Sequence, residues 1–173
     1  MRFCIANECL RVERESNGEL LLMSPAGSGT SYRNTQIILQ LGRWAEEDGR
    51  GLVFESNCGY TLPDGSVRSP DASWIAWKRW NALSPADQQR FAPICPEFLV
   101  ELRSPSDSLP ELQDKMRMWL ANGAELAWLI DPERKVVEIY RNGRQPEILE
   151  GATGVYGEGP VAGFELELAR LWA

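Results

Sequence analysis

The stretch Phe98-Leu99-Val100-Glu101-Leu102 decides the fold, because it is the most strand-like apolar run of the chain and carries a carboxylate within it. Side chains alternate between the two faces of a strand, so Glu101 shares a face with Leu99 and Arg103, opposite the other three residues. A carboxylate inside a core strand must be paired, hydrogen-bonded or bound to a metal ion. A simple pair with Arg103, or an edge strand without chemistry, remains an alternative explanation.

Two further groups accompany Glu101. Asp71 opens a second strand-like run, Asp71 to Ala76, directly after Pro70. After Ser104-Pro105-Ser106, a helix is expected from about Asp107 to Ala121. Its apolar stripe consists of Leu109, Leu112, Met116, Trp119 and Leu120. Lys115 lies at the margin of this stripe and can lean towards the sheet, although a surface lysine with a partly covered stem is the simpler alternative. We predict that Asp71, Glu101 and Lys115 converge at one edge of the sheet.

Strand and helix patterns alternate along the rest of the chain. A short helix ending near Asn7 precedes a hairpin, with strands from Leu10 to Glu15 and from Glu19 to Ser24 joined at Ser16-Asn17-Gly18. An amphipathic helix is expected from Ser31 to Glu47. Further strands are expected at Leu52 to Glu55, Gly59 to Leu62, Glu125 to Ile130, Val136 to Tyr140 and in the alternating tail Phe164 to Leu168, with one or two short helices between Trp77 and Phe91. This interleaving predicts an α/β (α+β) class with a mixed sheet, in a single domain spanning residues 1–173.

The composition restricts the chemistry. The chain of 173 residues has no histidine, which excludes Ser-His-Asp triads, histidine bases and most transition-metal sites. The four cysteines, Cys4, Cys9, Cys58 and Cys95, form no C-x-x-C pair, so we expect reduced thiols rather than a zinc or redox site. Carboxylates, lysine and hydroxyl groups remain as the groups that can carry chemistry.

The charge and hydropathy restrict the partners. A net charge of −7 argues against non-specific coating of nucleic acid, which depends on Lys and Arg neutralising phosphates. A local basic groove stays possible, although scattered surface charges are the simpler reading of Arg33, Arg43, Arg68, Lys78, Arg79 and Arg103. No apolar run approaches the roughly 20 residues of a membrane-spanning helix, and the start lacks the apolar stretch of a secretory signal. We therefore expect a soluble cytoplasmic protein without membrane contact.

Several motifs together resemble the Uma2 family (domain of unknown function 820), which is placed in the PD-(D/E)xK endonuclease superfamily. They are R-S-P-D-A-S-W at residues 68–74, P-I-C-P-E-F-L-V-E-L-R-S-P-S-D at residues 93–107, and Lys115 with W-L-I-D-P at residues 128–132. The resemblance extends from Arg11 to Trp172. It implies a restriction-endonuclease-like fold, in which helices flank a mixed central sheet with acidic residues at its open edge.

The resemblance also assigns roles to the candidate residues. Asp71 matches the aspartate of the PD motif, and Glu101 matches the acidic residue of the (D/E)xK strand. With the backbone carbonyl of Leu102 they would offer hard oxygen ligands for Mg²⁺ or Mn²⁺. Position 103 carries Arg103, which cannot lose a proton and act as a base. The family lysine matches Lys115 on the next helix instead.

The implied activity is metal-dependent hydrolysis of DNA phosphodiester bonds, with Arg68 and Arg103 as candidate phosphate contacts. The first helix of this superfamily often supplies another acidic residue, but the polar positions here are Asn34 and Gln36. A nuclease-fold binding protein with weak or no catalysis is therefore the main alternative, and a hydrolase of smaller phosphodiesters or nucleotides is a third. Cutting both strands of a duplex is simplest with two symmetric sites, which favours a homodimer or higher homo-oligomer.

Overall fold

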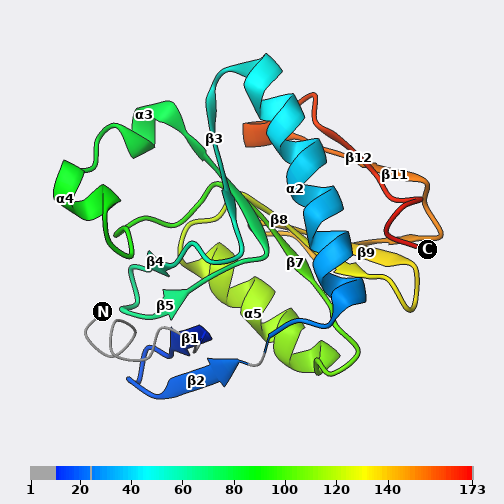
Figure 1. Cartoon of the computed structure of the whole chain (residues 1–173), viewed down its shortest axis with the longest axis horizontal. Coiled ribbons are helices and arrows are strands. Elements are labelled where there is room, and N and C mark those ends of the chain that lie inside the picture. Colours follow the sequence, from blue (N-terminus) through cyan, green and yellow to red (C-terminus); the bar gives the residue numbers. More distant parts are fainter. Residues whose placement is uncertain (1–10, 24, 173) are drawn as a thin grey trace.

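A six-stranded mixed sheet forms the centre of the molecule (Figure 1). The computed structural model describes residues 11–23 and 25–172; the short helix expected to end near Asn7, and the expected hairpin limits Leu10 and Ser24, lie outside them. The strands are, in spatial order, β10 (Glu147–Glu150), β9 (Val136–Arg141), β8 (Leu126–Asp131), β7 (Phe98–Leu102), β6 (Ala72–Ala76) and β3 (Gly51–Glu55). Only the β7–β8 pair is parallel among these neighbours, because a helix crosses over between its two strands.

Strand β7 is an inner strand of the sheet and carries Glu101. It spans the five residues expected from the sequence, and all five are buried. Val100 lies opposite Ala72 of β6 and opposite Trp128 of β8, so β7 is paired on both sides. The edge-strand alternative for Glu101 is therefore excluded.

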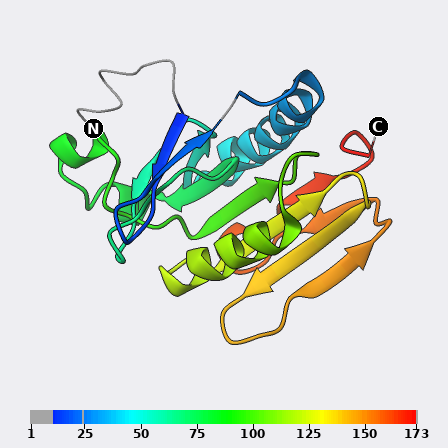
Figure 2. The same ribbon diagram turned by 90° about the horizontal axis from the view of Figure 1, so that it is seen from below.

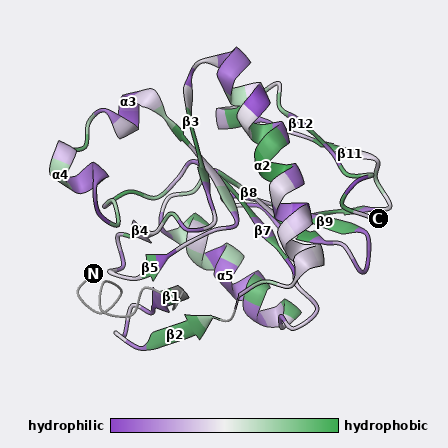
Figure 3. Ribbon diagram, in the orientation of Figure 1, coloured by the Kyte–Doolittle hydropathy of each residue, from purple (hydrophilic) through white to green (hydrophobic). Residues whose placement is uncertain are grey.

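Helices α2 (Ser28–Asp48) and α5 (Leu109–Ala121) cover opposite faces of this sheet (Figure 2). Phe98, Val100 and Leu102 pack in the cluster that includes the buried side of α2, whereas Leu99 packs with α5. The alternation expected for β7 is thus confirmed. Figure 3 shows the hydrophobic central strands running between the two helices.

The limits of both helices differ slightly from those expected. α2 begins three residues earlier than Ser31, after Gly27, which offers no side-chain cap, and it ends at Gly49 with a φ of 69°. α5 begins two residues later than Asp107, after Ser108. The apolar face predicted for α2 is confirmed, since Ile37, Leu41 and Ala45 are buried and Ile38 and Trp44 pack against the same cluster.

The predicted N-terminal hairpin is present as β1 (Arg11–Arg14) and β2 (Leu20–Met23). Its turn contains Gly18 with a φ of 90°, a conformation that favours glycine after Asn17. A single pairing, Arg14 with Val67, joins β1 to β5 (Val67–Arg68). β5 pairs in turn with β4 (Tyr60–Thr61), giving a small sheet in the order β2-β1-β5-β4. This sheet brings the hairpin beside the central strands.

Short elements complete the fold. α3 (Trp77–Trp80) and α4 (Pro85–Gln88) occupy the segment where one or two helices were expected, and Ser84 caps α4 by accepting a hydrogen bond from the Asp87 N–H. The C-terminal part forms β11 (Gly154–Tyr156), a 3-10 turn at Gly159–Val161, and β12 (Glu165–Glu167). Alternation in the tail is confirmed, because Phe164, Leu166 and Leu168 are buried between exposed glutamates.

The described residues contain neither a membrane-spanning helix nor a disulfide bond. No helix within 11–23 and 25–172 is long and apolar enough to span a lipid bilayer. In the same ranges, Cys58 and Cys95 are free thiols.

Candidate functional site

A cleft of about 590 Å³ lies where the β2 end, the start of α2 and the loop after β7 meet. Asp71, Glu101 and Lys115 all line it. These three residues are far apart in sequence, but the fold brings them close together. β6 pairs with β7, and α5 packs over β7 and β8. The three groups singled out in the sequence are thus brought together at one place.

Asp71 directly precedes β6 and is fixed from two directions. Its Oδ2 accepts a hydrogen bond from the Leu102 N–H at 2.8 Å, and its Oδ1 accepts one from Asn34 Nδ2 at 3.0 Å. Asn34 therefore reaches the site from α2, as the first-helix position was expected to do. Gln36 does not, because its Oε1 accepts a hydrogen bond from Arg170 elsewhere.

Glu101 projects from β7 beneath α5 and is 3% exposed. Its Oε1 accepts a hydrogen bond from Trp119 Nε1 at 2.8 Å and lies 3.0 Å from Lys115 Nζ. Burial raises the pKa of Glu101 to about 7, although the charge of Lys115 opposes the rise; Asp71 and Glu13 add to it. Glu101 can therefore change its charge near neutral pH.

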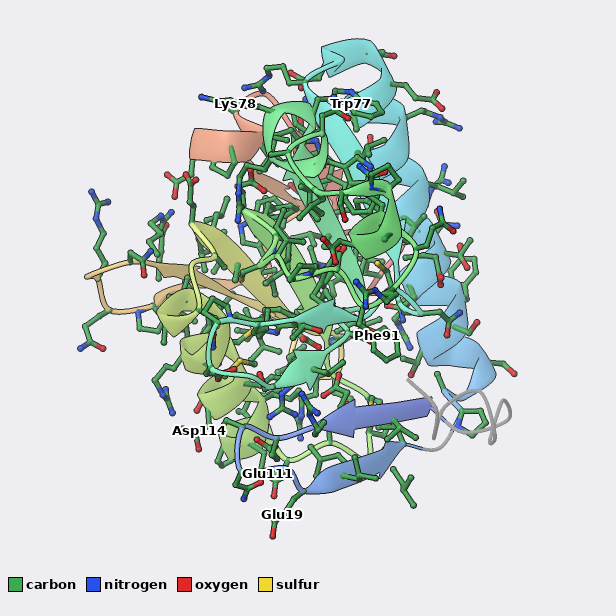
Figure 4. All side chains as sticks on the ribbon, turned by 90° about the vertical axis from the view of Figure 1, so that its left-hand side faces the viewer. Glu19, Trp77, Lys78, Phe91, Glu111 and Asp114 are labelled. Carbon is green, nitrogen blue, oxygen red and sulfur yellow. The ribbon has the colours of Figure 1, made fainter. Side chains whose placement is uncertain are left out.

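Lys115 lies between two carboxylates. Besides Glu101, its Nζ lies 3.2 Å from Glu13 Oε1. Burial by itself lowers the pKa of Lys115, but the charges of Glu101 and Glu13 outweigh it and raise that pKa above its ordinary value. Lys115 is thus an ammonium ion at neutral pH. The preceding residue, Asp114, points away from the body of the molecule (Figure 4), with a side chain that is 74% exposed.

Glu13 is a buried part of this cluster that sequence reasoning missed. It lies on β1 and is 3% exposed. Its Oε1 accepts a hydrogen bond from the Ser69 N–H at 3.0 Å, and its Oε2 accepts one from Arg68 Nη1 at 3.0 Å. The only signal in the sequence was a carboxylate inside a short strand, which is common in exposed hairpins.

The two arginines expected to contact phosphate are engaged in other pairs. Arg68 is 6% exposed, and its guanidinium pairs with Glu13 and Glu15. Arg103 Nη1 lies 2.7 Å from Asp131 Oδ2, so Arg103 pairs with Asp131 instead of with Glu101. Arg103 is not among the described residues that line the cleft. Both guanidinium groups form ion pairs within the chain, and their contact with phosphate stays a prediction. Arg33 of α2 lines the cleft, with its Nε donating to the Leu171 carbonyl.

The oxygen donors of the cleft suit a hard divalent cation. Within residues 11–23 and 25–172, no group of three or more His, Cys, Asp or Glu side chains is arranged to hold a metal ion. Mg²⁺, however, commonly uses one or two carboxylates together with waters and substrate phosphate. Asp71 and Glu101 meet that requirement. Asn34 Oδ1 is buried and accepts no hydrogen bond from the described residues, which leaves a further oxygen acceptor at the cleft.

Comparison with known proteins agrees with the fold. The model of the Uma2 family, described as "Putative restriction endonuclease", matches residues 1–169. A solved structure from Anabaena variabilis ATCC 29413, described as a putative nuclease belonging to DUF820, is similar with a TM-score of 0.79 at 18% identity, covering 93% of this chain and 89% of that chain. At that identity the likeness shows the fold, in which helices flank a mixed sheet as in restriction endonucleases. No curated protein matches the sequence.

Proposed function

Because the chain belongs to the Uma2 family, whose model is described as "Putative restriction endonuclease", we propose that it is a metal-dependent endonuclease that hydrolyses DNA phosphodiester bonds. The observation that carries the proposal is the convergence of Asp71, Glu101 and Lys115 on one cleft. An acidic side chain just before β6, a second on the adjacent strand β7, and a lysine that contacts the second are the groups that this hydrolysis requires. Asp71 and Lys115 are partly exposed where they line the cleft, and Glu101 lies beneath them.

The carboxylates would hold the cation. Asp71 is already oriented by Asn34 and by the Leu102 N–H, and Glu101 by Trp119, so the ligand oxygens need little rearrangement. The Leu102 carbonyl is the proposed backbone ligand. Mg²⁺ or Mn²⁺ bound there would supply a Lewis acid for the phosphate and lower the pKa of a water molecule.

Lys115 would act as a fixed positive charge. Its raised pKa keeps it protonated, so it is unsuited to remove a proton from water. An ammonium 3.0 Å from Glu101 lies close to where the phosphate would bind. It would stabilise the negative charge that develops on the phosphate oxygens in the transition state.

Contacts with the DNA backbone would come from the walls of the cleft. Thr30, Ser104 and Ser106 offer hydroxyl groups there, and Arg33 offers a guanidinium group. Arg68 and Arg103, which the sequence analysis expected to contact phosphate, form ion pairs with Glu13 and Asp131 within the chain. Paired sites in a homodimer or higher homo-oligomer, and action in the cytoplasm, remain parts of the same proposal.

A binding protein that retains the nuclease fold is the second candidate. Asn34 occupies the first-helix position at which an acidic residue is common, so the cation would have one negatively charged ligand fewer. Weaker cation binding would slow or abolish turnover while leaving the cleft able to bind a partner.

A cleavage assay decides between the two candidates. Purified protein is incubated with supercoiled, linear and single-stranded DNA in the presence of Mg²⁺, Mn²⁺ or a chelator. We expect cleavage that requires the cation and is abolished in Asp71→Asn and Glu101→Gln. Asp114→Asn is the matched control, because it removes an exposed carboxylate next to Lys115 in sequence and should cleave like the wild type. Equal cleavage by all variants would reveal a contaminating nuclease, and no cleavage of any DNA by the wild type would favour the binding protein.

A further inference from the structure

The N-terminal hairpin places a second carboxylate, that of Glu13, in contact with Lys115. Lys115 Nζ lies 3.0 Å from Glu101 Oε1 and 3.2 Å from Glu13 Oε1. Glu101 comes from the central sheet, whereas Glu13 comes from β1, 102 residues away from Lys115 in sequence. A lysine side chain is long and flexible, so two anchors restrict it far more than one.

Glu13 is itself held rigidly. The Ser69 N–H donates to the same Oε1 that contacts Lys115, and Arg68 pairs with Oε2. A buried carboxylate is costly unless it is paired and hydrogen-bonded, and Glu13 has three such partners. Burial tends to raise the pKa of Glu13, but Lys115, the Ser69 N–H and Arg68 together lower it. Glu13 therefore stays ionised beside Lys115.

These contacts make Glu13 a poor ligand for a cation. Glu13 contacts two cationic side chains, Arg68 and Lys115, whereas the ion pair of Glu101 is with Lys115, so a metal ion near Glu13 would meet an additional positive charge. Asp71 and Glu101 line the cleft, whereas Glu13 is not among the described residues that line it. Its effect on the site must therefore act through Lys115.

We infer that Glu13, clamped by Arg68 and Ser69, is a positioning residue that shares the charge of Lys115 with Glu101 and so leaves Glu101 available to a divalent cation. The inference rests on the proposed function of the cleft. Without Glu13, Lys115 would pair with Glu101 alone and compete with the cation for its oxygens. The hairpin is then part of the active site, because its docking through β5 sets the position of the lysine.

The chain offers a matched pair of variants for the test. Glu13→Gln removes the charge that faces Lys115 but keeps an oxygen acceptor. Glu15→Gln removes a carboxylate two residues further on that also pairs with Arg68, and no hydrogen bond among the described residues joins Glu15 to Lys115. Both variants remove an ion-pair partner of Arg68 from the hairpin, so an effect of losing such a pair should appear in both. An effect that acts through Lys115 should appear in Glu13→Gln alone.

The first readout is independent of activity. The chain has three lysines, Lys78, Lys115 and Lys135. Lys78 and Lys135 are exposed, and Lys78 lies on α3, at the end of the molecule opposite the hairpin (Figure 4). In protein labelled with ¹⁵N-lysine, the Lys115 ammonium should show slowly exchanging protons in the wild type and in Glu15→Gln. In Glu13→Gln we expect its exchange to be about tenfold faster or more, since one of its anchors is lost.

The second readout is the cation itself. Calorimetric titration with Mn²⁺ should show an affinity about 10- to 100-fold lower in Glu13→Gln and unchanged in Glu15→Gln, the range typical of residues that orient a site from outside. In cleavage assays, kcat should fall by a similar factor with an unchanged Kd for DNA. Glu13→Asp, which keeps the charge but shortens the side chain, should give an intermediate effect and serves as the test variant if Glu13→Gln does not fold.

Two results would overturn the inference. One is a Lys115 signal and a Mn²⁺ affinity in Glu13→Gln equal to those of the wild type. The other is an equal loss in Glu15→Gln, which would show that the hairpin acts only through stability. Absence of DNA cleavage by the wild type would refute the proposed function, but ammonium exchange and Mn²⁺ affinity would still decide the role of Glu13.

Discussion

Lowering the pH from 8 to 6 should weaken Mn²⁺ binding to the cleft about tenfold, because the proposed ligand Glu101 must be ionised to bind the cation. Burial raises the pKa of Glu101 to about 7 against the opposing charge of Lys115. With that pKa, about nine-tenths of Glu101 is ionised at pH 8 and about one-tenth at pH 6. The ratio of these fractions corresponds to about 1.4 kcal/mol of binding free energy. Affinity should therefore rise with pH across this window and level off above it.

Calorimetry at pH 6, 7 and 8, in two buffers with different enthalpies of ionisation, measures both the affinity and the protons released. Binding should release about 0.9 proton at pH 6 and about 0.1 at pH 8, since the cation displaces the proton on Glu101. Glu101→Gln should bind weakly at every pH, and Asp114→Asn should reproduce the wild-type profile. An affinity that depends on Glu101 but stays constant between pH 6 and pH 8 would refute this reasoning.

Three further substitutions test separate contacts of the site. Lys115→Met should lower kcat for DNA cleavage about a hundredfold with little change in the Kd for DNA, since its charge acts in the transition state; single-turnover kinetics and filter binding separate these effects. Arg68→Met should lower the free energy of unfolding in urea by about 3–5 kcal/mol, because it leaves the buried Glu13 without its guanidinium partner, and a loss below about 1 kcal/mol would contradict that. Trp119→Phe removes an N–H that stabilises ionised Glu101, so the pKa of Glu101 should rise and the midpoint of the Mn²⁺ affinity profile should move to higher pH. An unchanged midpoint would mean that this hydrogen bond does not stabilise the charge.

Local patterns in the sequence predicted most of the elements that carry the site. The strand Phe98–Leu102 was predicted residue by residue, and the hairpin turn was predicted at Asn17 and Gly18. Both depend on signals within a few residues, namely alternation of side chains and turn chemistry. β5, β10 and the three-residue strand β11 were missed. β5 has only two residues and β10 is largely exposed, so hydrogen bonds from a neighbouring strand define them rather than a pattern of their own.

The sequence by itself also singled out Asp71 and Glu101, because a carboxylate in an apolar strand is costly to bury without a partner. Lys115, at the margin of an apolar stripe, was added because it accompanies them and matches the lysine of the Uma2 family. Their convergence on one cleft depends on β6 pairing with β7 and on α5 packing over β7 and β8.

Only the tertiary structure decided which charges meet. Arg68, expected to contact phosphate, pairs with Glu13, 55 residues away in sequence, and Glu13 also contacts Lys115. A sequence shows where charges lie along each element. An ion pair depends on a separation of a few ångströms between distant residues, which is set when a hairpin packs against a sheet. The three-way contact of Arg68, Glu13 and Lys115 is therefore a property of packing, and so is the position of the lysine at the proposed catalytic site.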